Sequence, residues 1–322
     1  MNHREKSAFA IIAVLMTMML VLMSAGCGGK KTGASSGAGD AKGGMPLTVT
    51  MLDVGQGDAI LVRTPSQTIL IDTSDRDEND KFKKALDREG VKTIDKLILT
   101  HPHADHIGGV QVLMKGGYDV KAVYDNGQTT TTKMYRDYLK AIKSKNIPYK
   151  TLRDGDVLDF GDGVKFTVLS PTEDMVKEGG HEKGKDGKEK INLNLNSIVG
   201  RLTYKDFAML FTGDAEKPTE QGIIQRHGAD ALKSQVLKSP HHGSNTASSQ
   251  KFLKAVDPDI AVISCGVDND YHHPHPSIRT RYKQDKIDFY RTDVNGRIVI
   301  TSDGNGYNVS AERGDKNSDK GN

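Results

Sequence analysis

The alternation of hydrophobic and polar residues predicts a chain of short strands interrupted by helices. Apolar runs and period-two patterns predict strands at 47–52, 59–62, 68–71, 96–99, 121–124, 157–160, 164–169, 198–203, 207–211, 235–237, 260–264 and 297–300. Apolar residues at helical spacing predict helices at 80–89, 107–114, 133–145, 216–226, 248–255 and 277–284. Hairpins mixed with strand–helix units indicate two packed sheets with helices outside, an α/β sandwich.

The first 27 residues have the pattern of a secretion signal. A charged start with Arg4 and Lys6 precedes an apolar run over 7–23 and the small residues 24–26. Cys27, followed by two glycines, resembles the bacterial lipobox cysteine that is lipidated and becomes the mature N-terminus, although Ser24 replaces the usual leucine. The same run also fits an uncut membrane anchor, since about 17 residues is the lower limit for a span. Both interpretations place the remainder at the extracytoplasmic face of a bacterial cell membrane.

Amino-acid composition distinguishes three segments in the rest of the chain. Residues 28–45 are rich in Gly, Ser, Ala and Lys, which predicts a flexible tether. The polar stretch 313–322 predicts a disordered tail. Between them, 46–312 is long enough for one layered α/β domain, with a solvated Gly/Lys/Glu-rich insertion at 179–190.

Charge and cysteine content exclude several classes of protein. The 45 basic and 42 acidic residues give a net charge of +3, which excludes a strongly basic nucleic-acid-coating protein but leaves room for a local basic groove. Two cysteines are too few for a disulfide scaffold or a cysteine-rich zinc finger.

Metal-ligating side chains are concentrated directly after the strand predicted at 96–99. His101, His103, Asp105 and His106 lie within six residues. Imidazole and carboxylate groups are ligands of zinc, manganese and iron. A turn after a strand can direct the first two histidines to one ion and the next two residues to another, so we expect two adjacent divalent ions.

This HxHxDH motif resembles that of the metallo-β-lactamase family. The resemblance implies a four-layered αββα sandwich with a metal site at the sheet edges. It assigns Asp72 to structural support of the metal loop and Asp214 to a bridge between both ions. It makes His242 a metal ligand with His241 as its neighbour, although the sequence leaves the choice between these two open. The family's third histidine for the first ion is missing from 192–197, and His181, in the solvated insertion, is a poor substitute.

Several short sequence motifs resemble one subgroup more closely, the hydrolase domain of the DNA-uptake protein ComEC. The resemblance covers 47–305, and its motifs are LDVGQGDA (52–59), HPHADHIGG (101–109), NS (196–197), TGD (212–214), PHHGS (240–244) and HPHP (273–276). It identifies 46–312 as a metallo-β-lactamase-like hydrolase domain. The membrane channel of ComEC has no counterpart here, so we expect a stand-alone, lipid-tethered relative for which DNA transport is not implied.

The resulting site has two metal ions, Zn²⁺ or Mn²⁺. His101 and His103 hold the first ion, Asp105, His106 and His242 hold the second, and Asp214 bridges them. The first ion keeps open positions, so Asn196 is expected either to hydrogen-bond a ligand there or to cap its loop. The catalytic candidates are Asp105, Asp58, His273 and His275, and the substrate-contacting or supporting candidates are Asp53, Asp72, Asn196, His241 and Ser244.

Each of these candidates also has a structural interpretation. Asp58 serves in proton delivery and ligand support, or it is a turn carboxylate. His273 and His275 are a general acid or phosphate contact, or they belong to a surface loop. Ser244 donates to a phosphate or caps the next helix.

The expected activity is hydrolysis of a phosphodiester, with DNA among the candidate substrates. The alternatives are a metallohydrolase acting on another small ester or lactone, and a non-catalytic lipoprotein that binds DNA or the envelope. Near-neutral charge gives only modest attraction to a polyanion. The absence of tryptophan argues against an aromatic cage for phosphorylcholine, and the missing histidine argues against β-lactamase activity. No protein partner can be inferred.

Overall fold

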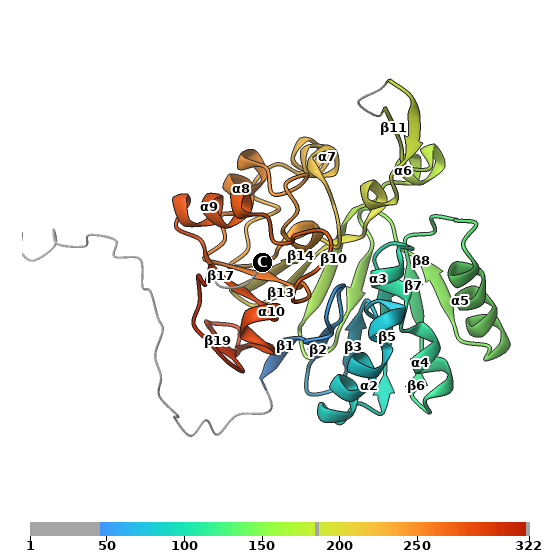
Figure 1. The fold of residues 1–322 in the computed structure, drawn as a ribbon. Coiled ribbons are helices and arrows are strands. Elements are labelled where there is room, and N and C mark those ends of the chain that lie inside the picture. The colour runs from blue at the N-terminus through green and yellow to red at the C-terminus, as the bar shows by residue number, and fades with distance from the viewer. Residues whose placement is uncertain (1–45, 184–186, 320–322) are drawn as a thin grey trace, which may run out of the picture. The chain divides into compact units, whose positions relative to one another are not determined.

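The computed structural model describes residues 46–183 and 187–319, which form two large β-sheets (Figure 1). The strands of the first sheet are β1 (Leu47–Met51), β2 (Ile60–Arg63), β3 (Thr68–Ile71), β5 (Lys96–Leu99), β7 (Val123–Asp125), β8 (Tyr149–Thr151), β18 (Ile298–Ser302) and β19 (Tyr307–Ala311). Their order is β19-β18-β1-β2-β3-β5-β7-β8.

The second sheet contains the central hairpins and three parallel pairings. Its strands are β9 (Val157–Asp159), β10 (Lys165–Ser170), β13 (Val199–Tyr204), β14 (Phe207–Phe211), β15 (Val236–Lys238), β16 (Ile260–Ile263) and β17 (Asp288–Arg291). Their order is β17-β16-β15-β14-β13-β10-β9. The predicted hairpins are present, because β9 pairs with β10 and β13 with β14 in antiparallel register.

The two sheets bury one face each against the other. Side chains alternate along a strand, so Val49 of β1 and Val62 of β2 face the second sheet. There they share one buried cluster with Phe166 and Phe211.

Helices cover the two outer faces. The first sheet is covered by α2 (Asn79–Arg88), α4 (Val110–Lys115) and α5 (Lys133–Ser144), which bury Phe82, Leu113 and Tyr138 against it. The second sheet is covered by α7 (Lys217–His227), α8 (Gln250–Val256) and α9 (Pro276–Gln284). Figure 1 shows these two helix groups on opposite outer sides. The predicted four-layered αββα sandwich is therefore confirmed.

The remaining elements are short. They are η1 (Arg76–Glu78), β4 (Thr93–Ile94), α3 (Ala104–Ile107), β6 (Asp119–Val120), α6 (Glu173–Glu178), β11 (His181–Lys183), β12 (Glu189–Ile191), η2 (Leu193–Asn196), η3 (Pro240–Gly243) and α10 (Thr292–Asn295). The helix predicted at 107–114 is divided into α3 and α4 at Gly108 and Gly109. A Cβ atom on either glycine would lie 2.1–2.2 Å from the backbone of the 73–76 segment, so close packing there requires glycine.

The insertion predicted to be solvated at 179–190 carries an antiparallel hairpin of β11 and β12, whose residues are exposed or half-buried. The tail was expected to be disordered from residue 313, but its described part, up to residue 319, is hydrogen-bonded to the domain. Asn295 Nδ2 donates to the carbonyl oxygens of Arg313 and Asp315, and Asn317 Oδ1 accepts from the Phe289 N–H at 2.8 Å. The polar composition suggested disorder, but these backbone and side-chain oxygens find donors on α10 and β17.

The predicted signal (1–27), its Cys27 and the tether (28–45) lie outside the described residues. Within the described part of the chain, no helix is long and apolar enough to cross a membrane.

Candidate metal centre

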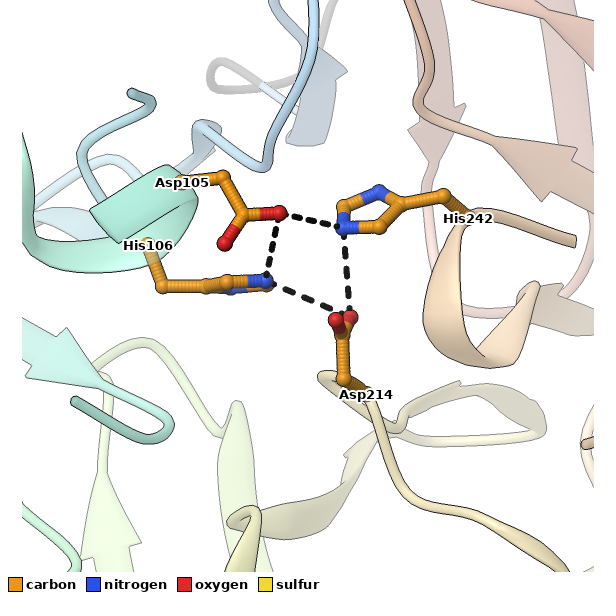
Figure 2. Close-up of side chains that lie close together, drawn as sticks. All are labelled: Asp105, His106, Asp214 and His242. Atoms are coloured by element: carbon orange, nitrogen blue, oxygen red, sulfur yellow. Dashed lines mark ion pairs between the residues drawn. The ribbon is translucent and has the colours of Figure 1, made fainter. Parts of the chain in front are cut away.

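Four metal-ligating side chains converge where strands of both sheets end. Asp105 and His106 lie on α3, just after β5; Asp214 follows β14, and His242 lies on η3, just after β15. Their ligand atoms all lie within 4.8 Å of one another, and Figure 2 shows them pointing into a common centre. His242 Nε2 is 3.2 Å from Asp105 Oδ2 and 3.3 Å from Asp214 Oδ1, while His106 Nε2 is 3.3 Å from Asp214 Oδ1.

The geometry and burial of these atoms fit a divalent metal ion. His106 Nε2, His242 Nε2 and Asp214 Oδ1 are all buried, and none makes a hydrogen bond of acceptable geometry within the described residues. A buried polar atom without a partner costs about 1–3 kcal/mol, so three such atoms converging on one point indicate a missing ligand. Two imidazole nitrogens and two carboxylates are a donor set suited to Zn²⁺ or Mn²⁺.

A second donor group faces the other oxygen of Asp214. His101 Nε2 lies 4.0 Å from Asp214 Oδ2 and 2.9 Å from His103 Nδ1. His241 Nε2 lies 3.7 Å from the same carboxylate oxygen. Asp214 therefore presents Oδ1 to one set of donors and Oδ2 to another, which is the arrangement expected of a bridging carboxylate.

Buried acceptors orient the imidazole rings of the second-ion ligands. Asp72 accepts hydrogen bonds from the Thr100 N–H at 2.7 Å and the Thr100 hydroxyl at 2.8 Å, and its Oδ2 lies 2.7 Å from His106 Nδ1. His242 Nδ1 donates to the Ser264 carbonyl at 2.8 Å. Each contact holds Nδ1 of its histidine in place and leaves Nε2 directed at Asp214. The hydrogen-bond partners of metal-ligating histidines typically orient the ring in this way. Asp72 thus lies where support of the metal loop requires it.

The carboxylates also perturb the histidines electrostatically. Burial lowers the pKa of His242, but the charges of Asp214 and Asp58 outweigh it and raise that pKa to about 10. For His106, too, burial lowers the pKa, and the nearby carboxylates, Asp214 foremost, reverse the direction and raise it well above its ordinary value. The same carboxylate charges favour a divalent cation, which would bind the neutral form of these imidazoles and displace their protons.

Asp58 lies behind the histidine rings and forms a buried ion pair. Its Oδ2 is 2.6 Å from Lys238 Nζ, and its Oδ1 is 3.6 Å from His242 Nδ1. Lys238 Nζ also donates to the Gly213 carbonyl, in the turn that carries Asp214, at 3.2 Å. Asp58 is 1% exposed and lies on the Nδ1 side of His242, away from the ligand atoms. This location suits support of the histidines and does not suit proton delivery to a substrate.

His273 is brought to the site, and His275 lies at its margin. The His273 ring centroid lies 5.5 Å from that of His241 and 6.2 Å from that of His242. Burial lowers the pKa of His273 to about 3, which keeps it neutral. His275 is the N-cap residue of α9, and its Nδ1 accepts from the Asn245 N–H at 3.3 Å.

Three expected residues point elsewhere. Asn196 Nδ2 donates to Gln128 Oε1 and to the Met175 carbonyl, so its amide is engaged away from the ligands. Ser244 Oγ lies 3.0 Å from Thr246 Oγ1 and does not cap α8, whose N-cap is Ser249. Asp53 pairs with Arg313 Nη2 at 3.3 Å.

Sequence reasoning missed Lys238, Asn194 and Glu216. The only sequence signal for Lys238 was its place at the end of an apolar strand. A lysine that is fully buried in such a place requires a charged partner. Glu216 was expected only as the start of a helix, yet its carboxylate lies 3.1 Å from His241 Nδ1. Asn194, two residues from Asn196, has its Nδ2 3.4 Å from His241 Nε2.

Comparisons with known proteins identify the family of this chain. The sequence model of the Metallo-beta-lactamase superfamily matches residues 52–267. ComE operon protein 3 of Bacillus subtilis (strain 168) is 31% identical over 268 residues, which cover 78% of this chain and 32% of that protein. Competence protein ComA of Neisseria gonorrhoeae is 32% identical over 255 residues, covering 78% of this chain and 31% of that protein. The chain thus spans about a third of the length of these relatives.

Among solved structures, the metallo-beta-lactamase fold protein YhfI from Bacillus subtilis aligns with a TM-score of 0.49 and 12% identity, over 76% of this chain and 95% of that chain. The superfamily match covers both the HxHxDH motif and His242. This chain belongs to the metallo-β-lactamase superfamily and is homologous to competence proteins of the ComEC type.

Proposed function

We propose that the chain is an extracytoplasmic, metal-dependent phosphodiesterase whose first candidate substrate is DNA. This proposal rests on the two carboxylate oxygens of Asp214, which face different sets of histidines. Oδ1 faces His106 and His242, and Oδ2 faces His101 and His241. Two divalent ions in such a site would acidify a water molecule and stabilise the charge that develops on phosphoryl oxygens.

The side chains around the site suggest where a phosphodiester would enter. The Asp105 side chain is 21% exposed and that of His241 is 20% exposed, whereas the side chains of Asp214, His106 and His242 are at most 3% exposed. The substrate would approach along the open edge formed by Asp105 and His241. Neutral His273, beside His241, can donate a ring N–H to a phosphoryl oxygen from there.

Two further features support this proposal. The relatives' names refer to competence and, for Recombination protein 2 of Haemophilus influenzae, to recombination, which makes DNA the phosphodiester to test first. The signal-like pattern with Cys27 supports attachment to the outer face of the cell membrane.

A second candidate is hydrolysis of a smaller ester. A cavity of about 820 Å³ is lined by Tyr271, whose ring lies 5.6 Å from that of His273. More acidic than basic side chains line it, including Asp75, Asp268 and Asp270. Such a wall repels a polyanion, so this cavity favours a small substrate without a long phosphate backbone.

The test uses the full-length chain in detergent, loaded separately with Mn²⁺ and Zn²⁺. End-labelled single-stranded DNA and bis(4-nitrophenyl) phosphate are the two substrates, with Asp105→Ala as the inactive variant and His181→Ala as the control. Metal-dependent DNA cleavage that Asp105→Ala loses and His181→Ala keeps supports the proposal. Hydrolysis of the small diester alone supports the second candidate. Failure to hydrolyse either substrate by a folded, metal-loaded protein overturns phosphodiester hydrolysis, of DNA and of small diesters alike.

A further inference from the structure

We infer that His241 is the third histidine ligand of the first metal site, which is the donor group of His101, His103 and Asp214 Oδ2. In this chain the loop at 192–197 lacks the histidine that the family usually supplies to that ion. His241 would replace it from a different part of the chain, beside the second-site ligand His242. This inference rests on the two-metal site of the proposed function and not on its substrate.

The backbone of η3 directs both histidines to one carboxylate. His241 (φ 48°, ψ 50°) and His242 (φ 52°, ψ 22°) are both left-handed, a costly conformation for consecutive non-glycine residues that is found most often at functional sites. The His241 N–H donates to the Gly213 carbonyl at 3.1 Å, which ties η3 to the turn of Asp214. As a result, His242 Nε2 faces Asp214 Oδ1 at 3.3 Å and His241 Nε2 faces Asp214 Oδ2 at 3.7 Å.

These separations suit a shared ion. Two ligand atoms that each lie about 2.1 Å from one ion are separated by roughly 3 to 4.2 Å, depending on the angle between them. His241 Nε2 at 3.7 Å and His101 Nε2 at 4.0 Å from Asp214 Oδ2 both fall in this range.

The other ring nitrogen of His241 has the partner that a metal ligand needs. His241 Nδ1 lies 3.1 Å from Glu216 Oε1, and Glu216 is only 9% exposed. Glu216 is itself held by the Thr246 hydroxyl at 2.9 Å and by Asn192 Nδ2 at 2.8 Å. Metal-ligating histidines typically place Nδ1 on such an anchored carboxylate, which leaves Nε2 for the ion. His241 Nδ1 also lies 3.2 Å from the Thr246 hydroxyl oxygen, so Glu216 and Thr246 together hold this ring nitrogen, the place that Asp72 takes beside His106.

The loop without a histidine contributes a different group at the same place. Asn194 of η2 has its Nδ2 3.4 Å from His241 Nε2, and its Oδ1 is buried without a hydrogen-bond partner within the described residues. The loop therefore still reaches the first metal site, and position 194 is the place in it to test a substituted histidine.

Metal content tests this inference without any substrate. The full-length chain in detergent is loaded with Zn²⁺ or Mn²⁺ and freed of excess metal by gel filtration, and bound metal is counted by mass spectrometry. We expect two equivalents in the native chain, one in His241→Ala, and two in His181→Ala, which removes an exposed histidine on β11. Titration calorimetry should show the first-site affinity falling at least 100-fold in His241→Ala.

Two further variants separate a ligand from a structural residue. Glu216→Gln keeps an acceptor for His241 but removes the charge, and it should weaken first-site affinity by about 10–100-fold while leaving the second site unchanged. Adding Asn194→His to His241→Ala should restore the second equivalent. If His241→Ala and Glu216→Gln both bind two equivalents with native affinities, His241 is not a ligand and the inference is overturned. Because no substrate is present, failure of the phosphodiesterase proposal would leave this result intact.

Discussion

The buried ion pair between Lys238 and Asp58 should be essential for stability. Lys238 Nζ lies 2.6 Å from Asp58 Oδ2, and the two side chains are 0% and 1% exposed. Burial lowers the pKa of Lys238, but the charges of Asp58 and Asp214 outweigh it and hold that pKa above its ordinary value. Lys238→Met therefore removes a positive charge and leaves the Asp58 carboxylate buried without its cation.

The expected cost follows from this burial. Removing one partner of a buried ion pair typically destabilises a protein by about 3–5 kcal/mol. For a domain of this size each kcal/mol lowers the melting temperature by about 2–4 °C, so the shift should be roughly 6–20 °C. Removing both charges with Lys238→Met and Asp58→Asn should cost less than the sum of the single variants, because neither charge is then left alone.

Urea and thermal unfolding, followed by circular dichroism, measure these costs. Lys233→Met is the matched control: this lysine side chain is 60% exposed and pairs with Asp230, so its removal should change stability by less than about 0.5 kcal/mol. If Lys238→Met costs under about 1 kcal/mol, or if the two single costs simply add, the reasoning about a coupled buried pair is wrong.

Three other predictions concern the metal site. Asp72→Asn, which removes the charge beside His106 Nδ1, should weaken metal affinity by about 10–100-fold in competition with a chromophoric chelator; native affinity would contradict the orienting role. In Gly57→Ala, the new Cβ would lie 2.3 Å from the Asp105 carbonyl oxygen at a φ of +111°. We therefore expect the free energy of unfolding, measured in urea, to fall by about 1–3 kcal/mol, together with reduced metal content. Unchanged metal content would show that Asp105 does not move. Metal at about 1,000 times its Kd stabilises by about 4 kcal/mol, so chelation should lower the calorimetric melting temperature by roughly 8–16 °C, and an unchanged melting temperature would argue against a tightly bound ion.

Much of the fold could be predicted because its signals are local. The apolar runs at 68–71 and 96–99 coincide with β3 and β5, since a buried strand needs only a few consecutive apolar residues. Strands β8, β17 and β19 were missed. Their mixed sequences, such as YKT in β8, become strands through pairing with a neighbour rather than through their own composition.

The side chains that form the candidate metal centre could also be located from sequence. His101 to His106 are adjacent in the chain, and Asp214 and His242 each follow a predicted strand. Parallel strands place their carboxyl ends at one edge of a sheet, and β14 and β15 are such a pair, so residues after those strands meet there.

The partners of these ligands depended on tertiary structure alone. Glu216 reaches His241 because the start of α7 packs beside η3, and Lys238 reaches Asp58 across the two sheets. Asn194, rather than Asn196, faces the histidines because one turn of η2 directs the neighbouring amide to Gln128. Residue types and spacing along the chain could name the groups able to bind a metal, because that ability is a property of each side chain. Which buried charges orient and neutralise these groups is decided only by the tertiary structure. Distant segments exclude water when they pack together, and each charge buried between them must then have a partner.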